Sequence, residues 1–490
     1  MNTNNKFYQA DFGFDEPFDL PLDTGDIFVA EKVVRLIPAR RLVAFGTWQG
    51  IEVVAKIFFD KKRAARHIQK EIAGIKALQK NNIPTPKLLA ECVSDDKRCQ
   101  VLIFERLTKA INLYEIWNAR QHISKVLVVL HAVITEIATQ HVLGLMQQDL
   151  HLKNFLITEK EVFNDVERVS HEHVQVYSLD GGEIISTGDI LDKKESMQNL
   201  ALFLSQLGAG VESYQLMLFR YYAKQRGWLI KQKDNVNLLR AIKKCYEERW
   251  ISYQKKIMRN STGFARINTF TKLAMYDRHY AKPEFMRFME CPDLLFSNSS
   301  VHLLKAGHSS TVVKVTLDGK EFVIKRYNMK SFFHWLRRCL RPTRASLCWH
   351  FAQKLTLLFI PTATPVAFIE QRVFGLRGKS YYVTEYIPGE NVGEFFKKHQ
   401  NDKTLTQAMI ARVSGLLRSL LSLRMTHGDL KMTNILLDKQ YQPILIDLDG
   451  MQEHTRGKTL RKSWKKELHR FLRNFDVGSE VRTSFEKELK

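Results

Sequence analysis

Two acidic residues and one amide near the end of the chain have the types and spacing that phosphate transfer requires. Asp429 is followed five residues later by Asn434. Asp447 comes directly after the apolar run 443–446. One carboxylate can orient an attacking hydroxyl, while a second carboxylate and an amide oxygen can hold the metal ion that accompanies a triphosphate. Since the interval from Asp429 to Asp447 allows a loop, a strand, a turn and a return strand, we expect these side chains to meet at one site.

The same pattern occurs earlier in the chain, in an internal repeat that covers most of the sequence. Asp149 is followed five residues later by Asn154, and an apolar stretch follows the Asn in each copy. A Leu-Asp-Gly segment then closes each copy, at 179–181 and at 448–450. A repeat this long exceeds the periods of solenoid proteins and indicates a duplicated domain.

The two copies differ around these carboxylates. When the Leu-Asp-Gly segments are aligned, Ser178 stands opposite Asp447, and Asp180 falls two positions further on. A serine hydroxyl supplies a metal ion with one oxygen and no charge. We therefore expect the first copy to lack its metal-binding carboxylate unless Asp180 takes that position. The first copy also has Gln147 where the second has His427.

Each copy has an apolar strand that ends in lysine, Lys56 in the first and Lys325 in the second. A lysine at such a place can steady the phosphates that are not transferred. Glu71 lies on a predicted helix after Lys56 and can form an ion pair with it, whereas counting from an Ile-Pro-Thr segment shared by the copies places Cys348 there in the second. Because losing a metal carboxylate harms catalysis more directly than losing an ion-pair partner, we expect the second copy to be the active one.

Neither copy has a full glycine-rich phosphate loop. The second offers the segment 307–311, in which the hydroxyls and amides of Ser309 and Ser310 can cradle phosphate. The first offers only Gly46.

The charge of the chain indicates an anionic partner. Lys and Arg number 75 against 52 Asp and Glu, a net charge of +23. None of the common nucleic-acid-binding motifs is present, so nucleic acid is not an expected partner. Two basic segments stand out, 325–344 with Phe332, Phe333 and Trp335 interleaved, and 455–473 with eight Lys or Arg and one Glu. Either can dock on an anionic lipid surface or a phosphorylated glycolipid, and the second can instead be a closing helix packed on the core.

Cysteine usage and hydropathy indicate a cytoplasmic protein. The six cysteines form no C-x-x-C pair, which fits buried thiols in a reducing compartment. The N-terminus has no basic start followed by an apolar run, as a secretory signal would. Apolar stretches such as 126–133 fall short of the ~20 residues of a membrane span. We expect a cytoplasmic protein, peripheral to a membrane.

The motifs resemble those of a known family. His-Gly-Asp-Leu-Lys-Met-Thr-Asn at 427–434, followed by Ile-Asp-Leu-Asp at 446–449, is similar to the lipopolysaccharide core kinases, the heptose and Kdo kinase family. Asp-Leu-His-Leu-Lys-Asn-Phe-Leu at 149–156 and Val-Val-Ala-Lys at 53–56 resemble the same family. The resemblance implies a protein-kinase-like fold, ATP with Mg²⁺ as cofactors, and an inner-core sugar as acceptor.

The resemblance also implies roles for individual residues. Asp429, and Asp149 in the first copy, would be the catalytic base. The metal would be held by Asn434 and Asp447, with Asp180 as the candidate in the first copy. The nucleotide would be bound in the second copy by Lys325, which joins Ser309 and Ser310 of the phosphate segment. In the first copy it would be bound by Lys56, Asn154 and Glu71, the last as the ion-pair partner of Lys56.

The order of elements in each copy, strands first and helices after, predicts an α+β protein. We expect two tandem protein-kinase-like domains, each with a strand-rich N-lobe and a helical C-lobe. The expected boundaries are a polar N-terminal segment over 1–30, a first domain over 31–257 that is degenerate, a linker over 258–300, and an active second domain over 301–490.

These inferences predict an ATP-dependent kinase that phosphorylates a heptose or Kdo hydroxyl of the lipopolysaccharide inner core at the cytoplasmic face of the inner membrane. Its partners would be the core glycolipid precursor and the anionic membrane surface. One alternative is a non-catalytic kinase-like module that binds core glycolipid or partner enzymes; the intact set around Asp429 argues against it. Another is a small-molecule kinase of the aminoglycoside or choline type, which shares the His-x-Asp-x-x-x-x-Asn pattern; the duplication and the basic aromatic segments favour a membrane acceptor instead.

Overall fold

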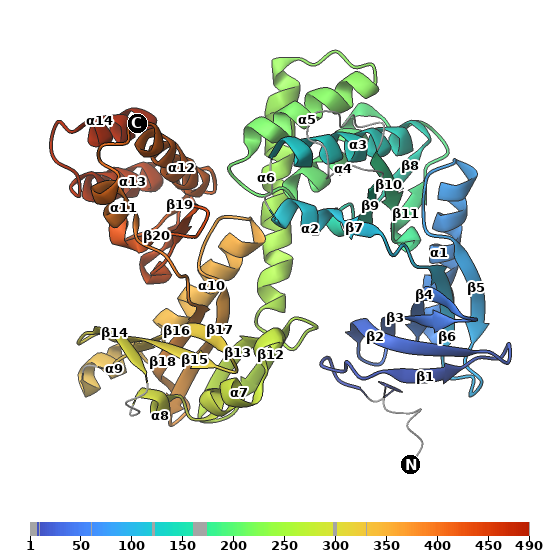
Figure 1. The fold of residues 1–490 in the computed structure, drawn as a ribbon, viewed down its shortest axis with the longest axis horizontal. Coiled ribbons are helices and arrows are strands. Elements are labelled where there is room, and N and C mark those ends of the chain that lie inside the picture. Colours follow the sequence, from blue (N-terminus) through green and yellow to red (C-terminus); the bar gives the residue numbers. More distant parts are fainter. Residues whose placement is uncertain are drawn as a thin grey trace. The chain divides into compact units, whose positions relative to one another are not determined.

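The computed structural model describes residues 7–8, 10–59, 61–119, 123–159, 174–296, 301–329 and 331–489. The chain forms two compact units. Unit 1 comprises Met1–Leu207 and Val211–Glu248, and unit 2 comprises Gly208–Gly210 and Arg249–Lys490. Both units combine strands with helices (Figure 1), which confirms the expected α+β class.

Unit 1 contains an antiparallel sheet whose described strands follow the order β1-β2-β3-β4-β6-β5. Side chains of β3 alternate between buried and half-buried, because successive residues of a strand point to opposite faces. The helix α1 (Lys61–Lys80) follows β4, and its Ile68 and Ile75 join a cluster with Leu102 and Phe104 of β6. The strands are β1 (Phe18–Pro21), β2 (Ile27–Ile37), β3 (Arg41–Trp48), β4 (Ile51–Phe58), β5 (Leu88–Val93) and β6 (Gln100–Glu105).

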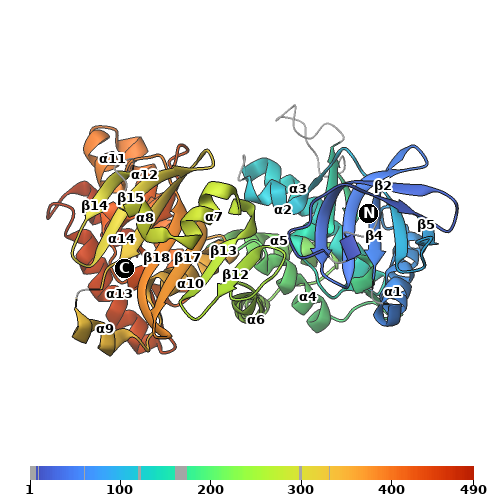
Figure 2. The same ribbon diagram turned by 90° about the horizontal axis from the view of Figure 1, so that it is seen from below.

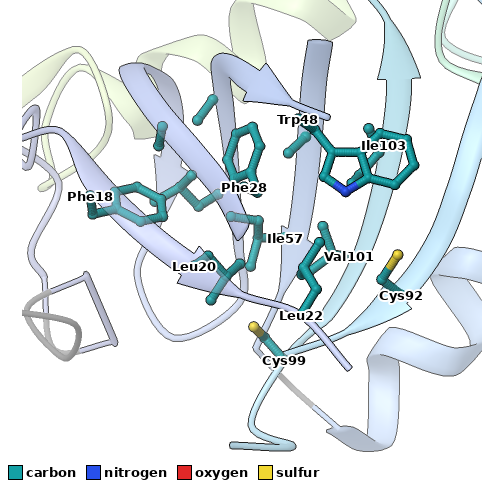
Figure 3. Close-up of a cluster of buried hydrophobic side chains, with 14 of the residues drawn as sticks. Phe18, Leu20, Leu22, Phe28, Trp48, Ile57, Cys92, Cys99, Val101 and Ile103 are labelled. Carbon is teal, nitrogen blue, oxygen red and sulfur yellow. The ribbon is translucent and has the colours of Figure 1, made fainter. Parts of the chain in front are cut away.

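Part of the expected polar N-terminal segment over 1–30 forms strands of this sheet. Strand β1 pairs antiparallel with β2. Phe18, Leu20 and Phe28 are buried together in the core of the sheet (Figure 3). Asp19, between the first two, is exposed. Asp19 therefore occupies an outward position of the strand, between two buried apolar residues.

The helical part of unit 1 follows the sheet. Its α3 carries a buried apolar face that includes Val129, Leu130, Val133 and Ile137. Short strands between the helices carry the Asp149 segment. The helices are α2 (Leu113–Asn118), α3 (Ile123–Val142), α4 (Lys193–Ser205), α5 (Glu212–Gln225) and α6 (Gln232–Lys256), which continues into unit 2; the strands are β7 (Ala110–Asn112), β8 (Leu145–Gln147), β9 (Phe155–Glu159), β10 (Val174–Ser178) and β11 (Ile184–Ser186).

Among the described helices, α3 alone has the length and composition of a membrane span. The apolar run at 126–133 is therefore part of a longer apolar helix than the sequence suggested. Half of that helix is buried inside the protein, as is common for a core helix.

Unit 2 contains a second antiparallel sheet whose described strands follow the order β12-β13-β17-β18-β16-β15-β14. Its β12 and β13 come from the interval 258–300, where a linker was expected. Strand β13 pairs with β17, and Phe285 and Met289 of α7 (Pro283–Glu290) are buried against the sheet. The described part of the interval is therefore folded; 297–300 lie outside the described residues. The strands are β12 (Phe264–Asn268), β13 (Lys272–Asp277), β14 (His302–Ala306), β15 (Ser310–Leu317), β16 (Lys320–Tyr327), β17 (Pro365–Val373) and β18 (Leu376–Glu385).

The helical part of unit 2 follows its sheet, so both units share the order expected from the sequence. Strands β20 (Ile435–Leu437) and β21 (Pro443–Leu445) form a hairpin that carries Asp447. The helices of this part are α11 (Val392–Lys398), α12 (Lys403–Ser422), α13 (Gly457–Leu472) and α14 (Glu480–Leu489), and its remaining strands are β19 (Met425–Thr426) and β22 (Gln452–Glu453). Three further helices lie among the strands of the sheet: α8 (Pro292–Phe296) before β14, and α9 (Phe332–Arg338) and α10 (Arg344–Leu357) between β16 and β17.

The role of the N-terminal segment can be tested by comparing two substitutions on neighbouring strands. Leu20→Ala should lower the free energy of unfolding of unit 1 by about 2–4 kcal/mol, because it leaves a cavity in a packed core. Ile27→Ala should change it by about 0.5 kcal/mol or less, because Ile27 is exposed. Urea unfolding followed through the fluorescence of Trp48, which lies in the same core, measures both. Equal and small changes in the free energy of unfolding for both variants would contradict a role of β1 in the core of unit 1.

Candidate active site

The site in unit 2 is organised around Lys325 on β16. Its ammonium group hydrogen-bonds Oδ1 of Asp447 and lies 3.3 Å from Oδ2 of Asp449. Burial by itself would lower the pKa of Lys325, but the two carboxylates outweigh it and the pKa is raised. Burial would likewise raise the pKa of Asp447, but the attraction of Lys325 holds it below its ordinary value. The pair is therefore charged at neutral pH.

The hairpin β20–β21 places Asp447. The backbone N–H of Ile446 donates to the carbonyl of Asn434 at 3.0 Å, so the end of the hairpin is tied to its start. Asp447 then takes a left-handed conformation with φ of +62°, which costs a non-glycine residue energy but is tolerated best by Asp and Asn. This turn brings its carboxylate to Lys325.

Asp429 and Asn434 are held together by the short loop between them. The side-chain N–H of Asn434 donates to the backbone carbonyl of Asp429 at 2.8 Å. The carboxylate of Asp429 also meets two cations, Lys431 at 3.1 Å and Arg470 of α13 at 3.2 Å. Arg470 donates a second bond, to the carbonyl of Gly428 at 2.7 Å. The aspartate is thus half-exposed and bracketed by positive charge.

A cavity of about 380 Å³ lies between the sheet and the hairpin of unit 2. Lys325, Asp447 and Asn434 line it, and so do apolar side chains such as Val312 and Leu436. Of the two predicted phosphate-loop serines, Ser310 lines this cavity, whereas Ser309 lines a separate pocket formed with arginines. The structure therefore brings Ser310 to the expected site and turns Ser309 away from it.

Unit 1 assembles the corresponding residues of the first copy. The Lys56 ammonium lies 2.6 Å from Glu71 on α1 and 3.2 Å from Asp180. The Asn154 side chain donates to the backbone carbonyl of Asp149 at 2.8 Å, the same bond that Asn434 makes in unit 2. Burial would raise the pKa of Asp180, but Lys56 more than offsets it, and the pKa lies below its ordinary value.

The hydrogen-bond register corrects the alignment of the two copies. Leu179 donates its backbone N–H to the carbonyl of Asn154 at 2.8 Å, as Ile446 does to Asn434. The next residue, Asp180, has φ of +64° and bonds the lysine, as Asp447 does. Asp180 therefore corresponds to Asp447, and the expectation that Ser178 occupies that place was wrong. Aligning the Leu-Asp-Gly segments gave the wrong correspondence between the copies. The equivalent aspartates, Asp180 and Asp447, each come two residues after the end of a strand, β10 in unit 1 and β21 in unit 2.

The second carboxylate on each lysine comes from a different element in each unit. In unit 1 it is Glu71 of α1, and a Cβ added to Gly182 would lie 3.0 Å from its Oε2. In unit 2 the position of Gly182 is taken by Asp449, which supplies the carboxylate from the loop. The helix α10 presents Cys348 instead, whose pKa burial raises to about 12, so the thiol stays protonated. The absence of a helix glutamate in the second copy is thus compensated within the loop.

Gln147 and His427 perform the same task. The side chain of Gln147 donates to the carbonyl of Leu179 at 2.9 Å, and Nε2 of His427 bonds the carbonyl of Ile446 at 2.9 Å. Burial lowers the pKa of His427, so the imidazole is neutral at pH 7. The histidine of the second copy is a positioning residue for the Asp447 turn.

Several neighbours of the site were not found from the sequence. Arg470 lies 41 residues after Asp429, on the helix α13. The sequence showed that this segment is basic, but it did not indicate that Arg470 contacts Asp429. Glu467, on the same helix, accepts the backbone N–H groups of His427 and Gly428 and so fixes the start of the loop. In unit 1, Arg35 and Arg41 of the sheet contribute positive potential at Asp180. Only the fold brings these residues to the site.

The equivalence of Gln147 and His427 can be tested by substitution. His427→Gln should keep the bond to Ile446, whereas His427→Ala should cost about 1–3 kcal/mol of stability by leaving a buried carbonyl unpaired. Because the pKa of His427 is lower in the folded state, the unfolded chain takes up a proton first, and the contribution of His427 to stability is lost as the pH falls below about 6.5. Urea unfolding of His427→Gln should show a weaker loss of stability on acidification than the parent protein. An unchanged pH dependence would contradict the assignment.

Comparison with known proteins places these residues in a family. A model of the lipopolysaccharide kinase (Kdo/WaaP) family matches residues 52–180 and 305–487, which is more than half of the chain and includes the lysines and aspartates of both units. A search of curated proteins gives no match. The members of the family are kinases that act on sugar hydroxyls. The chain therefore belongs to the lipopolysaccharide kinase (Kdo/WaaP) family.

Proposed function

We propose that this protein transfers the γ-phosphate of ATP to a heptose or Kdo hydroxyl of the lipopolysaccharide inner core, and that unit 2 is a protein-kinase-like domain that performs the transfer. The observation that carries the proposal is the convergence of Lys325, Asp447 and Asn434 on one cavity, with Asp429 joined to Asn434. Phosphoryl transfer depends mainly on positioning and charge stabilisation, and these residue types supply both.

The cavity suits a nucleotide. Its apolar lining can hold a base, and Lys325 can contact the α- and β-phosphates. Because the side-chain N–H of Asn434 is used in the bond to Asp429, its oxygen is left to face a ligand. This oxygen and the Asp447 carboxylate are ligands that Mg²⁺ prefers. No group of three or more His, Cys, Asp or Glu in the described chain can hold a metal alone, so phosphate oxygens and water would complete the shell.

In the transfer step, the acceptor hydroxyl oxygen bonds to the γ-phosphorus while the bond from that phosphorus to the ADP oxygen breaks. Asp429 orients the hydroxyl and accepts its proton. Lys431 and Arg470, both within about 3.2 Å of Asp429, would offset the charge of the phosphoryl group and bind an acidic group on the acceptor. Other exposed basic residues lie on α13 before Arg470. They support an acceptor with several negative charges, as a core glycolipid has.

Unit 1 has no missing carboxylate, so the reason for regarding it as degenerate is removed. We propose that it is a second protein-kinase-like domain that binds nucleotide through Lys56, Glu71 and Asp180. Asp149 has the place of Asp429 but lacks an equivalent of Lys431, since His151 stands there. Because the residues around Asp149 differ from those around Asp429, we propose that unit 1 either phosphorylates a different acceptor or supports the reaction of unit 2.

Replacing the proposed base tests the function of unit 2. Asp429→Asn should reduce phosphate transfer to purified core glycolipid by at least about 100-fold, because the amide cannot accept the proton. Asp476→Asn, the same change at an exposed position of the same unit, should leave the rate unchanged. Circular dichroism establishes that both proteins are folded. Near-normal transfer by folded Asp429→Asn would refute the assignment.

The two carboxylates on Lys325 are expected to differ in their effect on the nucleotide. Asp447→Ala should abolish Mg²⁺-dependent binding of ATP to unit 2, because it removes the metal ligand. Asp449→Ala should weaken it only about tenfold, because Lys325 keeps its bond to Asp447. Calorimetric titration with and without Mg²⁺, on an Asp180→Ala background that silences unit 1, measures both. Loss of binding in Asp449→Ala with retention in Asp447→Ala would reverse the two roles.

A further inference from the structure

One end of the unit 2 sheet exposes large apolar side chains from three separate segments. Phe374, in the turn between β17 and β18, is 86% exposed, Leu340 after α9 is 79% exposed, and Phe270, between β12 and β13, is 72% exposed. Leu336 of α9 is also exposed. Isolated exposed apolar residues are ordinary on protein surfaces, so the question is whether these lie together.

Contacts to the β17–β18 hairpin bring the three segments to one place. Arg377 of β18 donates to the carbonyl of Leu340 at 3.0 Å, and Trp335 of α9 donates to the carbonyl of Arg377 at 2.8 Å. On the other side, Arg372 of β17 donates its backbone N–H to Thr271 at 2.7 Å. The ring of Phe270 lies beside Gly375, 3.5 Å from where a Cβ would be. The apolar residues therefore project from adjoining segments at one end of the sheet.

Arginines of the α9 segment accompany this apolar group. Arg337, Arg338 and Arg341 are exposed. No carboxylate of the described residues forms an ion pair with Arg338, Arg341 or Arg344. In Figures 1 and 2, α9 lies at the periphery of its unit, beside the sheet. The surface thus combines apolar side chains with uncompensated positive charge.

Two of these exposed arginines, together with Arg344 and Arg377, line a pocket. Arg338, Arg341, Arg344 and Arg377 line a cavity of about 80 Å³, together with Ser309 and the backbone around Gly378. No acidic residue lines it, although Arg377 is paired with Glu370, whose Oε1 lies 3.2 Å from its Nε. The cavity has room for more than one water molecule, and guanidinium groups recognise phosphate through paired N–H donors. The pocket is therefore suited to a phosphate group presented next to an apolar surface.

We propose that this end of unit 2, defined by Phe270, Leu336, Leu340, Phe374 and the arginines of the pocket, docks on an anionic phospholipid bilayer. The apolar side chains would enter the interface, and the arginines would bind lipid phosphates. A bilayer is the partner whose chemistry matches both features, since it presents phosphate above an apolar layer. The inference goes beyond the proposed phosphate transfer and does not depend on it, because docking requires neither nucleotide nor acceptor.

Vesicle sedimentation with the full chain tests the proposal. The vesicles are phosphatidylcholine alone or phosphatidylcholine with about one third phosphatidylglycerol. The parent protein should bind the anionic vesicles. The double variant Arg338→Ala/Arg341→Ala should bind them about 30-fold more weakly, or about 2 kcal/mol. Leu340→Ser/Phe374→Ser should weaken binding at least tenfold and should reduce its persistence at high salt.

Matched controls separate this surface from general charge and exposure. Lys397→Ala/Lys398→Ala removes two exposed charges from α11 of the same unit, and Leu229→Ser/Val477→Ser removes two exposed apolar side chains elsewhere. Both should bind vesicles nearly as the parent does. Equal losses in variants and controls would overturn the proposal, and so would failure of the parent to bind anionic vesicles. Binding of inorganic phosphate by the arginines without any vesicle binding would make the pocket a site for a soluble anion and would also overturn it.

Discussion

The ion pair between a strand lysine and the aspartate of a following loop is the interaction on which each site depends. Lys56 with Asp180, and Lys325 with Asp447, join the sheet of a unit to its helical part. Both aspartates are half-buried, and each lysine also meets a second carboxylate, Glu71 in unit 1 and Asp449 in unit 2, so the charges of each site neutralise one another within the protein. The pair therefore holds the groups that would bind phosphate and metal in register before any ligand arrives.

The two units reach this arrangement by different local means. A helix glutamate supports the lysine in unit 1, and the loop residue Asp449 supports it in unit 2. A glutamine fixes the carbonyl before the aspartate in unit 1, and a neutral histidine does so in unit 2. In unit 1 the loop packs so closely on α1 that a Cβ on Gly74 would lie 1.8 Å from the carbonyl oxygen of Gly181. The geometry is shared although the side chains that maintain it are exchanged.

The sequence predicted the repeat, the α+β class and the meeting of Lys325, Asp447, Asn434 and Asp429, because each depends on local patterns. It failed where the outcome depends on register or on distant packing. The hydrogen bond from Leu179 to Asn154 determines which residue faces Lys56. The spacing of residues in the sequence does not reveal this hydrogen bond. Arg470 approaches Asp429 from a helix 41 residues away, which only the fold determines. Strands β12 and β13 were missed because they carry none of the motifs by which the domains were delimited.

The most direct test of the central claim is mass spectrometry of the lipopolysaccharide core from cells that lack the protein and from the same cells carrying the Asp429→Asn or Asp149→Asn variant. The account predicts that a core phosphate is absent without the protein and is not restored by Asp429→Asn. A second, different phosphate lost with Asp149→Asn would show that unit 1 also transfers phosphate. A fully phosphorylated core in cells without the protein, or full restoration by Asp429→Asn, would contradict the account.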